Sequence, residues 1–595
     1  MCGIAGILSK KLDNHAIASK LGAMQEALNH RGPDGRGDYF SPSGHAGLAH
    51  TRLSIIDLSD NGAQPMSSHN DRYTISFNGE IYNYQTLREE LIQQGHTFQS
   101  QSDTEVILNS YIEFGDACVN KLRGMFAFVI WDEQEQSAFA ARDPFGIKPF
   151  YYWHDQNSFA FASEIKAVMQ SGLNKKTLSS QGVFSYFKTG SVSEPYTLIN
   201  DIQLLQAGHT LSWKDGQVSK NRYWAIDFPE SKQYSREVAI QKTRSALIDS
   251  LNAHLVADVP VGIFLSGGID STALLALASS ISTTPINTYS IAFENPEWNE
   301  GDIAQRIADH FGANHTELIM TPSLAQTLFD DYINAIDQPS IDGFNTFCVS
   351  KLAHDNNEKV VLSGLGGDEL FAGYKSFELL PKMQNASRRF ALLSDITCFM
   401  GKHLKRWLPT KLNRVMDFLS QPNSLIAAQQ SLRGIFSHHE ALTLTQEITA
   451  QDQLSITNPY EPKHQHIKDN VSDIELSTYM RNQLLRDSDS MSMYWGLELR
   501  VPFIDSVLFD EVSSIPADLR LEQGKQLLID SVPEIPEWVS NRPKQGFRFP
   551  FDEWFSKNWQ HSVIDFNTPT WIKLKPWYRR WSLVVLSDWV KRYAK

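Results

Sequence analysis

The stretch VGIFLSGGIDSTALLALA, residues 261–278, decides the fold of the larger part of this chain. It opens with the apolar run Val261–Leu265, passes through a glycine-rich turn at Ser266–Thr272 and continues as an Ala- and Leu-rich segment. A short apolar run bounded by glycines is typical of a strand buried on both faces, and the Ala/Leu segment indicates a helix. The stretch therefore predicts one strand–turn–helix unit of a parallel sheet.

The same pattern recurs downstream. We expect a second strand at Thr288–Phe293, a helix at Ile303–Phe311 and a third strand at Val360–Leu362, which is again followed by a glycine-rich turn, Ser363–Glu369. Strands that alternate with helices favour a doubly wound parallel sheet. Residues 236–595 are therefore predicted to form an α/β domain with helical additions.

The region before it has a different character. Short apolar or alternating runs are bounded there by Gly, Asp, Asn or Pro, which predicts antiparallel strands with few helices. The expected strands are Ala46–Asp57, Arg72–Asn78, Met125–Asp132 and Ser158–Ala162, and the expected helices are Ala16–Leu28 and Tyr84–Gln94. Around Trp213–Gln233 the chain turns polar. We therefore expect domains at 1–213 and 236–595 with a linker at 214–235.

Composition sets the class of protein. With 595 residues, 42% of them hydrophobic and 21% charged, the chain is expected to be a soluble globular protein of two or more domains. A net charge of −14 argues against bulk binding to nucleic acid. The start MCGIAGILSKK lacks the pattern of a signal peptide, and no apolar run approaches the roughly 18 residues of a membrane helix.

Four cysteines are present: Cys2, Cys118, Cys348 and Cys398. They are too few and too scattered for a disulfide framework or a Cys-rich metal site, which fits a reducing cytoplasm. Cys2 follows the initiator, and its small size permits removal of Met1. It would then carry both a thiol and an α-amine of pKa about 7.7–8, which can serve as its own general base. Alone, it is equally consistent with an accidental cysteine.

Other short segments supply groups that an amide-cleaving thiol needs. Asn78-Gly79, predicted as a tight turn at the end of a strand, offers a side-chain amide and a backbone N–H for an oxyanion, worth about 3–4 kcal/mol per donor. Arg52 suits a substrate carboxylate, and acidic side chains suit its ammonium group. Ser102–Glu105 looks like a helix N-cap. Each feature alone is more often structural.

Taken together, six ordered motifs resemble the class II glutamine amidotransferases. They are Cys2-Gly3-Ile4, His30–Asp34, Arg52–Asp57, Asn78–Asn83, Ser102–Glu105 and Arg142–Pro149. The resemblance covers about the first 200 residues and implies an antiparallel αββα sandwich of the N-terminal-nucleophile type. It also implies Cys2 as the nucleophile, Asn78 and Gly79 as the oxyanion hole, Arg52 on the glutamine carboxylate, and Glu80 and Asp103 around its amino group.

The turn Ser266–Thr272 predicts a nucleotide site. A turn between a strand and a helix can direct N–H groups and hydroxyls at phosphate oxygens, at the positive end of the helix. It is not a Walker P-loop, since no GxxxxGK[ST] occurs. A turn without function is the alternative. The turn resembles the pyrophosphate loop of the ATP-pyrophosphatase family, which implies that ATP is bound by Leu265, Ser266, Gly267, Gly268, Asp270, Ser271, Ser363 and Gly364.

A metal site is expected beside the nucleotide. The carboxyl ends of parallel strands line a common crevice, so Asp270 and Asp368 could face one Mg²⁺ that bridges the phosphates. The alternative is that Asp368 and Glu369 merely cap a helix.

Three further motifs, Leu497–Asp505, Arg542–Phe547 and Arg486-Asp487 with Met491–Met493, are similar to the synthetase domain of glutamine-hydrolysing asparagine synthetases. The resemblance then spans nearly the whole chain. It implies that ammonia released at Cys2 reaches an acyl-adenylate of aspartate, giving asparagine, glutamate, AMP and pyrophosphate. Glutamine, ATP and aspartate are the implied partners, with no nucleic acid and no membrane. Lys544 would face the developing negative charge; a surface lysine is the alternative.

One residue departs from the family pattern. Leu365 stands where well-established asparagine synthetases carry an acidic residue, and a leucine can neither accept a proton nor hold ammonia by charge. An alternative is therefore amidation of another carboxylate, such as a uronic acid of a surface polysaccharide. A non-catalytic regulatory protein is a third hypothesis, against which the intact Cys2, Asn78, Asp270 and Asp368 argue. The sequence leaves open the ammonia path, a homodimer and the role of the basic segment 382–414.

Overall fold

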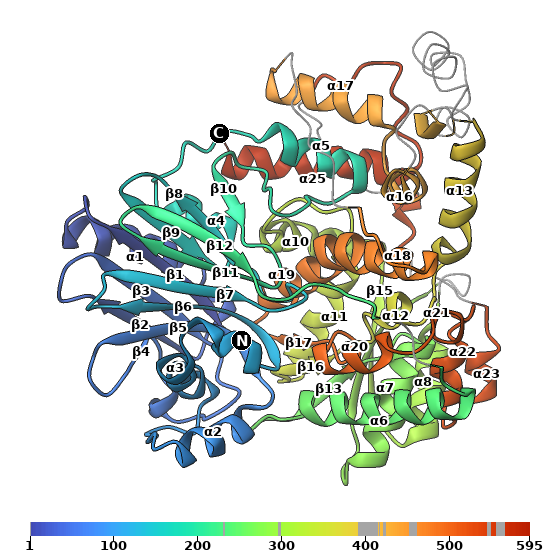
Figure 1. Cartoon of the computed structure of the whole chain (residues 1–595). Helices are drawn as coiled ribbons and strands as arrows, with labels where there is room; N and C mark the ends of the chain where they lie inside the picture. The colour runs from blue at the N-terminus through green and yellow to red at the C-terminus, as the bar shows by residue number, and fades with distance from the viewer. Residues whose placement is uncertain are drawn as a thin grey trace.

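The computed structural model describes residues 2–229, 233–294, 299–390, 415, 417–419, 424–451, 461–543, 549–551, 553–554 and 566–594. Figure 1 shows an N-terminal domain of strands beside a C-terminal domain of strands and many helices. Among the described residues, no helix is long and apolar enough to cross a membrane. Most of the basic segment 382–414 and Lys544 lie outside the described residues.

Two antiparallel six-stranded sheets form the N-terminal domain, in the orders β10-β8-β9-β1-β3-β2 and β12-β11-β7-β6-β5-β4. The strands are β1 Gly3–Ser9, β2 Gly35–Phe40, β3 Ala46–Arg52, β4 Met66–Ser67, β5 Tyr73–Ile81, β6 Gly124–Asp132, β7 Ser137–Arg142, β8 Tyr151–His154, β9 Ser158–Ala162, β10 Ile202–Leu204, β11 His209–Lys214 and β12 Gln217–Arg222. The helices are α1 Asn14–Glu26, η1 Asn29–Arg31, η2 Asp60–Gly62, α2 Tyr84–Gln93, α3 Asp103–Phe114, η3 Gly115–Lys121, α4 Ile165–Gln170 and α5 Ser180–Thr189.

Strand β6 shows why the two sheets stack between helices. Ala127, Val129 and Trp131 belong to the core between the sheets, whereas Phe126 and Phe128 belong to the core under α2 and α3. Alternate residues of a strand point to opposite faces, so a strand that is apolar throughout is covered on both sides. Helices α1 and α4 cover the other sheet, over β1, β3, β8 and β9. The predicted αββα sandwich is thus confirmed.

Two local predictions differ from the structure. Asn78-Gly79 is not a turn: it lies inside β5, where Asn78 pairs with Ala127 and Gly79 with Phe126. The local turn preference of Asn-Gly yields to a full ladder of hydrogen bonds with β6. Strand β12 lies within the segment 214–235 that the sequence predicts as a linker, because the turn at 215–216 folds it back onto β11.

The C-terminal domain contains a five-stranded sheet in the order β15-β14-β13-β16-β17, with every neighbouring pair parallel. Its strands are β13 Val261–Phe264, β14 Asn287–Phe293, β15 Asn314–Met320, β16 Val360–Leu362 and β17 Glu498–Arg500. The chain runs outward from β13 to β15 and then returns to β16 on the other side of β13. Because ligands bind at such a reversal of strand order, the carboxyl ends of β13 and β16 are the expected site.

Helices surround this sheet, as expected for a doubly wound fold (Figure 1). Helices α7 and α8 follow β13 and β14, and α11 packs against β14 and β15. The described helices are α6 Arg236–His254, α7 Ile269–Ile281, α8 Gly301–Phe311, α9 Pro322–Thr327, α10 Phe329–Ala335, α11 Phe344–Asp355, α12 Gly367–Leu370, α13 Ser376–Phe390, α16 Leu425–Arg433, α17 His438–Thr449, α18 Ile467–Ile474, η5 Glu475–Leu485, α19 Arg486–Met493, α20 Ser506–Ser513, α21 Ala517–Arg520, α22 Gln526–Ser531, α23 Glu537–Ser540 and α25 Trp577–Tyr593.

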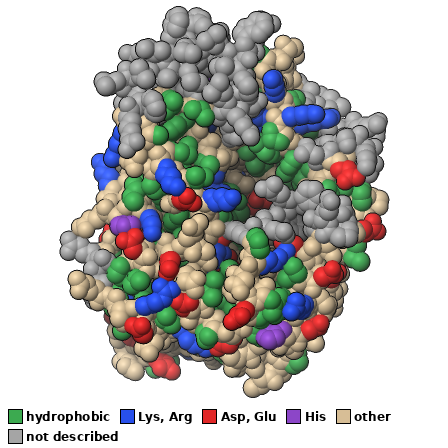
Figure 2. Space-filling view, turned by 90° about the vertical axis from the view of Figure 1, so that its right-hand side faces the viewer, with side chains coloured by type: hydrophobic (Ala, Val, Ile, Leu, Met, Phe, Trp, Pro, Cys, Tyr) green, Lys and Arg blue, Asp and Glu red, His purple; other side chains and the backbone are tan. Residues whose placement is uncertain are grey.

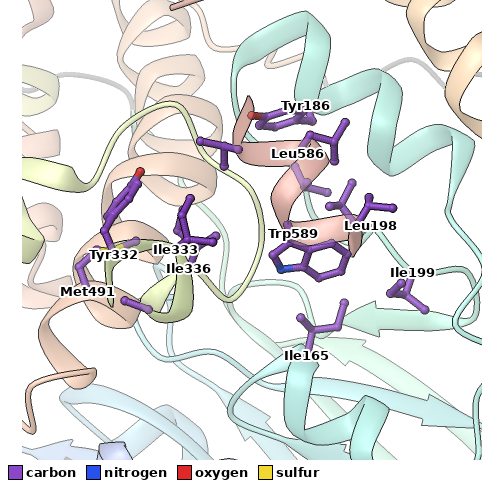
Figure 3. Close-up of a cluster of buried hydrophobic side chains, with 14 of the residues drawn as sticks. Ile165, Tyr186, Leu198, Ile199, Tyr332, Ile333, Ile336, Met491, Leu586 and Trp589 are labelled. Carbon is purple, nitrogen blue, oxygen red and sulfur yellow. The ribbon is translucent and has the colours of Figure 1, made fainter. Parts of the chain in front are cut away.

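A shared apolar core joins the two domains. Figure 3 shows Trp589 of α25 among side chains of both, including Ile165 and Leu198 from the N-terminal domain and Ile336 from the C-terminal domain. The Trp589 indole N–H donates to the carbonyl oxygen of Asp337 at 3.0 Å, so the ring is buried without an unsatisfied polar group. The last described helix therefore holds the domains together.

Candidate active site

Cys2 lies directly before β1, with a side chain that is only 8% exposed. Its backbone N–H donates to Oδ1 of Asn78 at 3.0 Å, and its Sγ lies 4.0 Å from the carbonyl oxygen of Leu53. Burial raises the pKa of the Cys2 thiol, and the nearby Glu80 acts in the same direction. The thiol is therefore protonated at neutral pH, so a nucleophilic role requires a base close by.

Asn78 places an unused donor beside this thiol. Its side chain is fully buried, and its Nδ2 has no hydrogen-bond partner among the described residues, whereas its Oδ1 is bound to Cys2. The neighbouring Gly79 packs so tightly on β6 that an added Cβ would lie 2.1 Å from the carbonyl oxygen of Met125. An unsatisfied buried donor is costly unless something fills it, so Asn78 can meet a developing oxyanion.

The residues predicted to hold glutamine lie around the same point. Arg52 ends β3, donates to the carbonyl oxygens of Asp57 and Ser59, and lies close enough to lower the pKa of the Cys2 thiol. Glu80 is 4% exposed, and Asp103 accepts the Ile81 N–H at 3.0 Å from the first turn of α3. The structure thus brings together Cys2, Arg52, Asn78, Gly79, Glu80 and Asp103 from four separate segments.

The two glycine-rich turns meet at the carboxyl ends of β13 and β16. A Cβ added to Gly364 would lie only 2.9 Å from the backbone nitrogen of Ser271. A Cβ added to Gly367 would lie 2.3 Å from a carboxylate oxygen of Asp270. Gly268 begins α7 without a side-chain cap, and Gly267 has φ +73°, a conformation that favours glycine. Open N–H groups at the start of a helix suit phosphate oxygens.

Asp270 and Asp368 converge on one cation of the chain itself. Lys525, which lies just before α22, forms ion pairs through its Nζ with both carboxylates. Gly373 lies against them, since a Cβ there would collide with Asp368 Oδ1 and Lys525 Cε. Both carboxylates reach one cation of the chain, and Mg²⁺ at nucleotide sites commonly uses one or two carboxylates plus phosphate oxygens. These residues therefore fit Mg²⁺.

Leu365 lies in the second turn, partly buried against the apolar core of the C-terminal domain. Glu369, four residues later in α12, is completely buried. Burial, together with Asp368 and Glu475, raises the pKa of Glu369 to about 8. Its carboxyl group is thus uncharged at neutral pH and supplies no negative charge in place of the missing acid at position 365.

A basic side chain lies beside the first glycine-rich turn. Arg542 pairs with Glu300 at 3.4 Å, and its Nη1 lies 3.5 Å from the position that a Cβ at Gly267 would take. Lys544, two residues further on, is outside the described residues. Figure 2 shows one side of the molecule hollowed near its middle, with Lys or Arg side chains beside the hollow.

A buried polar cluster lies at the boundary between the two domains. Asp489 of α19 pairs with Arg31 at 2.8 Å and with Lys148 at 3.2 Å, both from the N-terminal domain. Arg31 also donates to the carbonyl oxygen of Cys2 at 3.2 Å. A small cavity beside this cluster is lined by residues of both domains, among them Glu164 and Arg486.

Two family models together match most of the chain. Residues 1–224 match the model of the glutamine amidotransferase domain, and residues 242–568 match that of asparagine synthase. Asparagine synthetase [glutamine-hydrolyzing] 1 of Bacillus subtilis is 33% identical over 585 residues, covering 95% of this chain and 90% of that protein.

This chain belongs to the glutamine-hydrolysing asparagine synthetase family. It is a glutamine-hydrolysing carbon–nitrogen ligase.

Proteins with other names are also similar to it. Amidase chry2 of Gibberella zeae is 27% identical, covering 93% of this chain and 90% of that protein. Among solved structures, the glutamine phosphoribosylpyrophosphate amidotransferase from B. subtilis is 16% identical, covering 61% of this chain and 81% of that one, with a TM-score of 0.29.

Sequence reasoning missed several residues of this site. Lys525, Gly373, Asp489 and Arg31 have no role in the sequence prediction, although Arg31 and Asp489 lie within or beside motifs that it quotes. Lys525 follows a glycine and has φ +64°, an unusual conformation for lysine. The Gly524-Lys525 pair is a local indication of a turn, but it does not indicate which distant carboxylates the lysine contacts.

Proposed function

We propose that this ligase transfers the amide nitrogen of glutamine to aspartate, forming asparagine, glutamate, AMP and pyrophosphate. The proposal rests on two arrangements in one chain. Asn78, whose Nδ2 has no hydrogen-bond partner among the described residues, lies beside Cys2, and Asp270 and Asp368 converge at the glycine-rich turns. The named asparagine synthetases that share nearly its whole length support aspartate as the acceptor.

The first half-reaction uses the N-terminal domain. After removal of Met1, the Cys2 thiol gives its proton to its own α-amine, and Sγ attacks the side-chain carbonyl of glutamine. Asn78 Nδ2 and the Gly79 N–H stabilise the oxyanion. Ammonia leaves with the proton, and water hydrolyses the thioester to glutamate. Arg52 holds the substrate carboxylate, while Glu80 and Asp103 hold its ammonium group.

The second half-reaction uses the C-terminal domain. The acceptor carboxylate attacks the α-phosphorus of ATP and pyrophosphate leaves; ammonia then attacks the acyl carbon and AMP leaves. The turn residues Leu265, Ser266, Gly267, Gly268, Ser271, Ser363 and Gly364 bind the nucleotide in this proposal, and Lys544 faces the charge that develops. Asp270 and Asp368 would hold Mg²⁺, which when bound neutralises phosphate charge.

Ammonia travels inside the protein in this proposal. The cavity lined by Arg31, Glu164, Arg486 and Asp489 lies at the boundary between the two domains and supports such a path. An internal path keeps ammonia unprotonated, and only the neutral amine is a nucleophile.

A second acceptor class is favoured by Leu365. An apolar side chain in the turn, with Glu369 uncharged nearby, suits a larger carboxylate that does not rely on a charge at that position, such as a uronic acid of a surface polysaccharide. Family relatives named as amidases are compatible with this alternative.

A panel of acceptors tests the proposal. The full chain, with glutamine, ATP and Mg²⁺, is offered aspartate, glucuronate or galacturonate, and AMP release and amide product are measured. Aspartate should give AMP and asparagine in equal amounts. Intact glutamine hydrolysis without turnover of aspartate, but with turnover of a uronic acid, would replace the first acceptor with the second.

A further inference from the structure

Strand β17 brings charged side chains of the C-terminal domain to the glutamine site. Arg500 is completely buried, and its Nη2 lies 3.6 Å from Oε2 of Glu80. Its Nη1 donates at 2.7 Å to the carbonyl oxygens of His254 and Val256, and its Nε donates to Glu498. Three hydrogen bonds within the C-terminal domain therefore fix the guanidinium, so that domain sets its position relative to Glu80.

The two atoms of this pair that face each other have unused hydrogen-bonding capacity. Arg500 Nη2 and Glu80 Oε2 both lack a hydrogen-bond partner within the part of the chain that the structure describes. At 3.6 Å they attract each other without forming a hydrogen bond. Glu80 is thus held near a cation while one of its oxygens stays available to another donor.

Nearby charges act on the ionisation of Glu80 in opposite directions. Burial raises the pKa of Glu80 well above its usual value, Glu498 raises it further, and Arg500 lowers it. Asp103 is the third carboxylate of this group. Because the pKa of Glu80 stays raised even beside Arg500, a further positive charge such as a substrate ammonium group would favour the ionised form of Glu80.

The backbone of the same residue touches the nucleotide side. The Ser363 N–H donates to the Arg500 carbonyl oxygen at 2.8 Å, and Leu362 of β16 pairs with Arg500 in the sheet. Ser363 begins the glycine-rich turn that leads to Asp368. One residue therefore contacts the nucleotide turn through its main chain and the glutamine site through its side chain.

We propose that Arg500 is a positioning residue for glutamine, acting through Glu80, so that the C-terminal domain completes the glutamine-binding site. This inference rests on the proposed role of Glu80 in binding the glutamine ammonium group. Arg500 orients Glu80 and favours its ionised form, and the incoming ammonium binds the oxygen that Arg500 leaves open.

The test compares Arg500→Met with Arg123→Met in the full chain. Arg123 is a second arginine at the domain boundary, but it binds Asp505 and Asp249 rather than Glu80. Arg500→Met should raise the KM for glutamine about ten- to hundredfold, the effect of losing one charged contact, with a smaller change in kcat. The KM for ammonium in synthesis is the internal reference, because the backbone bond to Ser363 remains. Arg123→Met should leave the ratio of the two KM values as in the wild type.

Glu80→Gln and the double variant separate the possible failures. If Arg500 acts through Glu80, the double variant has the same KM for glutamine as Glu80→Gln alone. Additive effects, or an Arg500→Met variant that behaves like Arg123→Met while Glu80→Gln raises KM, would overturn the inference and leave the proposed function intact. A normal KM in Glu80→Gln would refute the proposed role of Glu80 itself.

A conservative variant covers the case in which Arg500→Met does not fold. Arg500→Lys keeps the charge but loses the forked geometry, so its KM for glutamine should rise less than tenfold and its fold should be retained. An Arg500→Lys protein with wild-type KM for glutamine, combined with a raised KM in Glu80→Gln, would overturn the inference.

Discussion

Arg31 and Asp489 form a buried ion pair across the boundary between the two domains, with Nη2 and Oδ2 2.8 Å apart. Asp489 also holds Lys148, and Arg31 also binds the main chain of Cys2. One carboxylate of α19 thus secures two cations of the N-terminal domain, one of which supports the proposed nucleophile.

Replacing Asp489 should destabilise the protein strongly. Asp489→Ala removes the ion-pair partner of Lys148 and weakens the pairing of Arg31, so we expect the free energy of unfolding to fall by about 3–5 kcal/mol. Calorimetry should record a marked fall in Tm. Glu26→Ala is the control, since it breaks the exposed pair with Arg36 and should leave Tm unchanged. Equal effects of the two changes would contradict this account.

Cys2→Ala should abolish glutamine-dependent synthesis and spare synthesis from added ammonium, because the two sites carry separate chemistry. Paired assays with glutamine and with ammonium measure this, and intact mass should show Cys2 as the N-terminus of the wild type. Cys118→Ala, which alters a buried thiol under α3, is the control and should retain glutamine hydrolysis. Glutamine-dependent synthesis by Cys2→Ala would show that another group is the nucleophile.

Asp270→Asn should reduce acceptor-dependent release of AMP and pyrophosphate by about 100-fold or more, since a carboxylate that holds a metal governs phosphate charge. Glutamine hydrolysis should remain. Asp302→Asn, on the exposed face of α8, serves as the control. Formation of ADP by the wild type would rule out adenylation.

Leu365→Glu distinguishes the two acceptor classes. With aspartate as the natural acceptor, turnover should be kept or increased, because the change restores an acid beside the nucleotide turn. With a larger acid, crowding and repulsion should lower it. Leu365→Gln, of similar size without charge, isolates the charge effect. A wild-type rate on aspartate of about 1 s⁻¹ or more would show that Leu365 does not hinder this acceptor.

Glutamine use should fall in acid. Burial raises the pKa of Asp103 to about 6, although the Ile81 N–H lowers it. In the proposed role the carboxylate binds ammonium, so kcat/KM for glutamine should drop about tenfold per pH unit below 6. Asp103→Asn should have a low kcat/KM that does not fall further as the pH drops below 6. A wild-type profile without a group near pH 6 would contradict the assignment.

The same pKa has a consequence for stability. Because the folded value exceeds the unfolded value of about 3.9, the stabilising contribution of Asp103 is full below pH 3.9 and is lost as the pH rises through 6. The Tm of Asp103→Asn should therefore improve relative to the wild type between pH 4 and 7.

Much of the architecture could be predicted because it depends on local pattern. The apolar run at 261–265 with its glycine-rich turn is a strand, turn and helix in the structure, and the continuously apolar strand β6 is buried on both faces. Ser102 caps α3 as the N-cap pattern indicates. The prediction of a turn at Asn78-Gly79 was wrong because strand pairing with β6 outweighed the turn preference of the Asn-Gly dipeptide.

Motif chemistry likewise gave the identity of most candidate site residues, since Cys2, Asn78 and Asp270 have functional groups that are informative at their own positions. Only the tertiary structure decided which charged groups pair with one another. Lys525 pairs with Asp270, Arg500 lies beside Glu80, and Arg31 pairs with Asp489, each across hundreds of residues. Such contacts leave no periodic trace in sequence, because the attraction between buried charges depends on their distance and on the exclusion of water, and folding alone sets both.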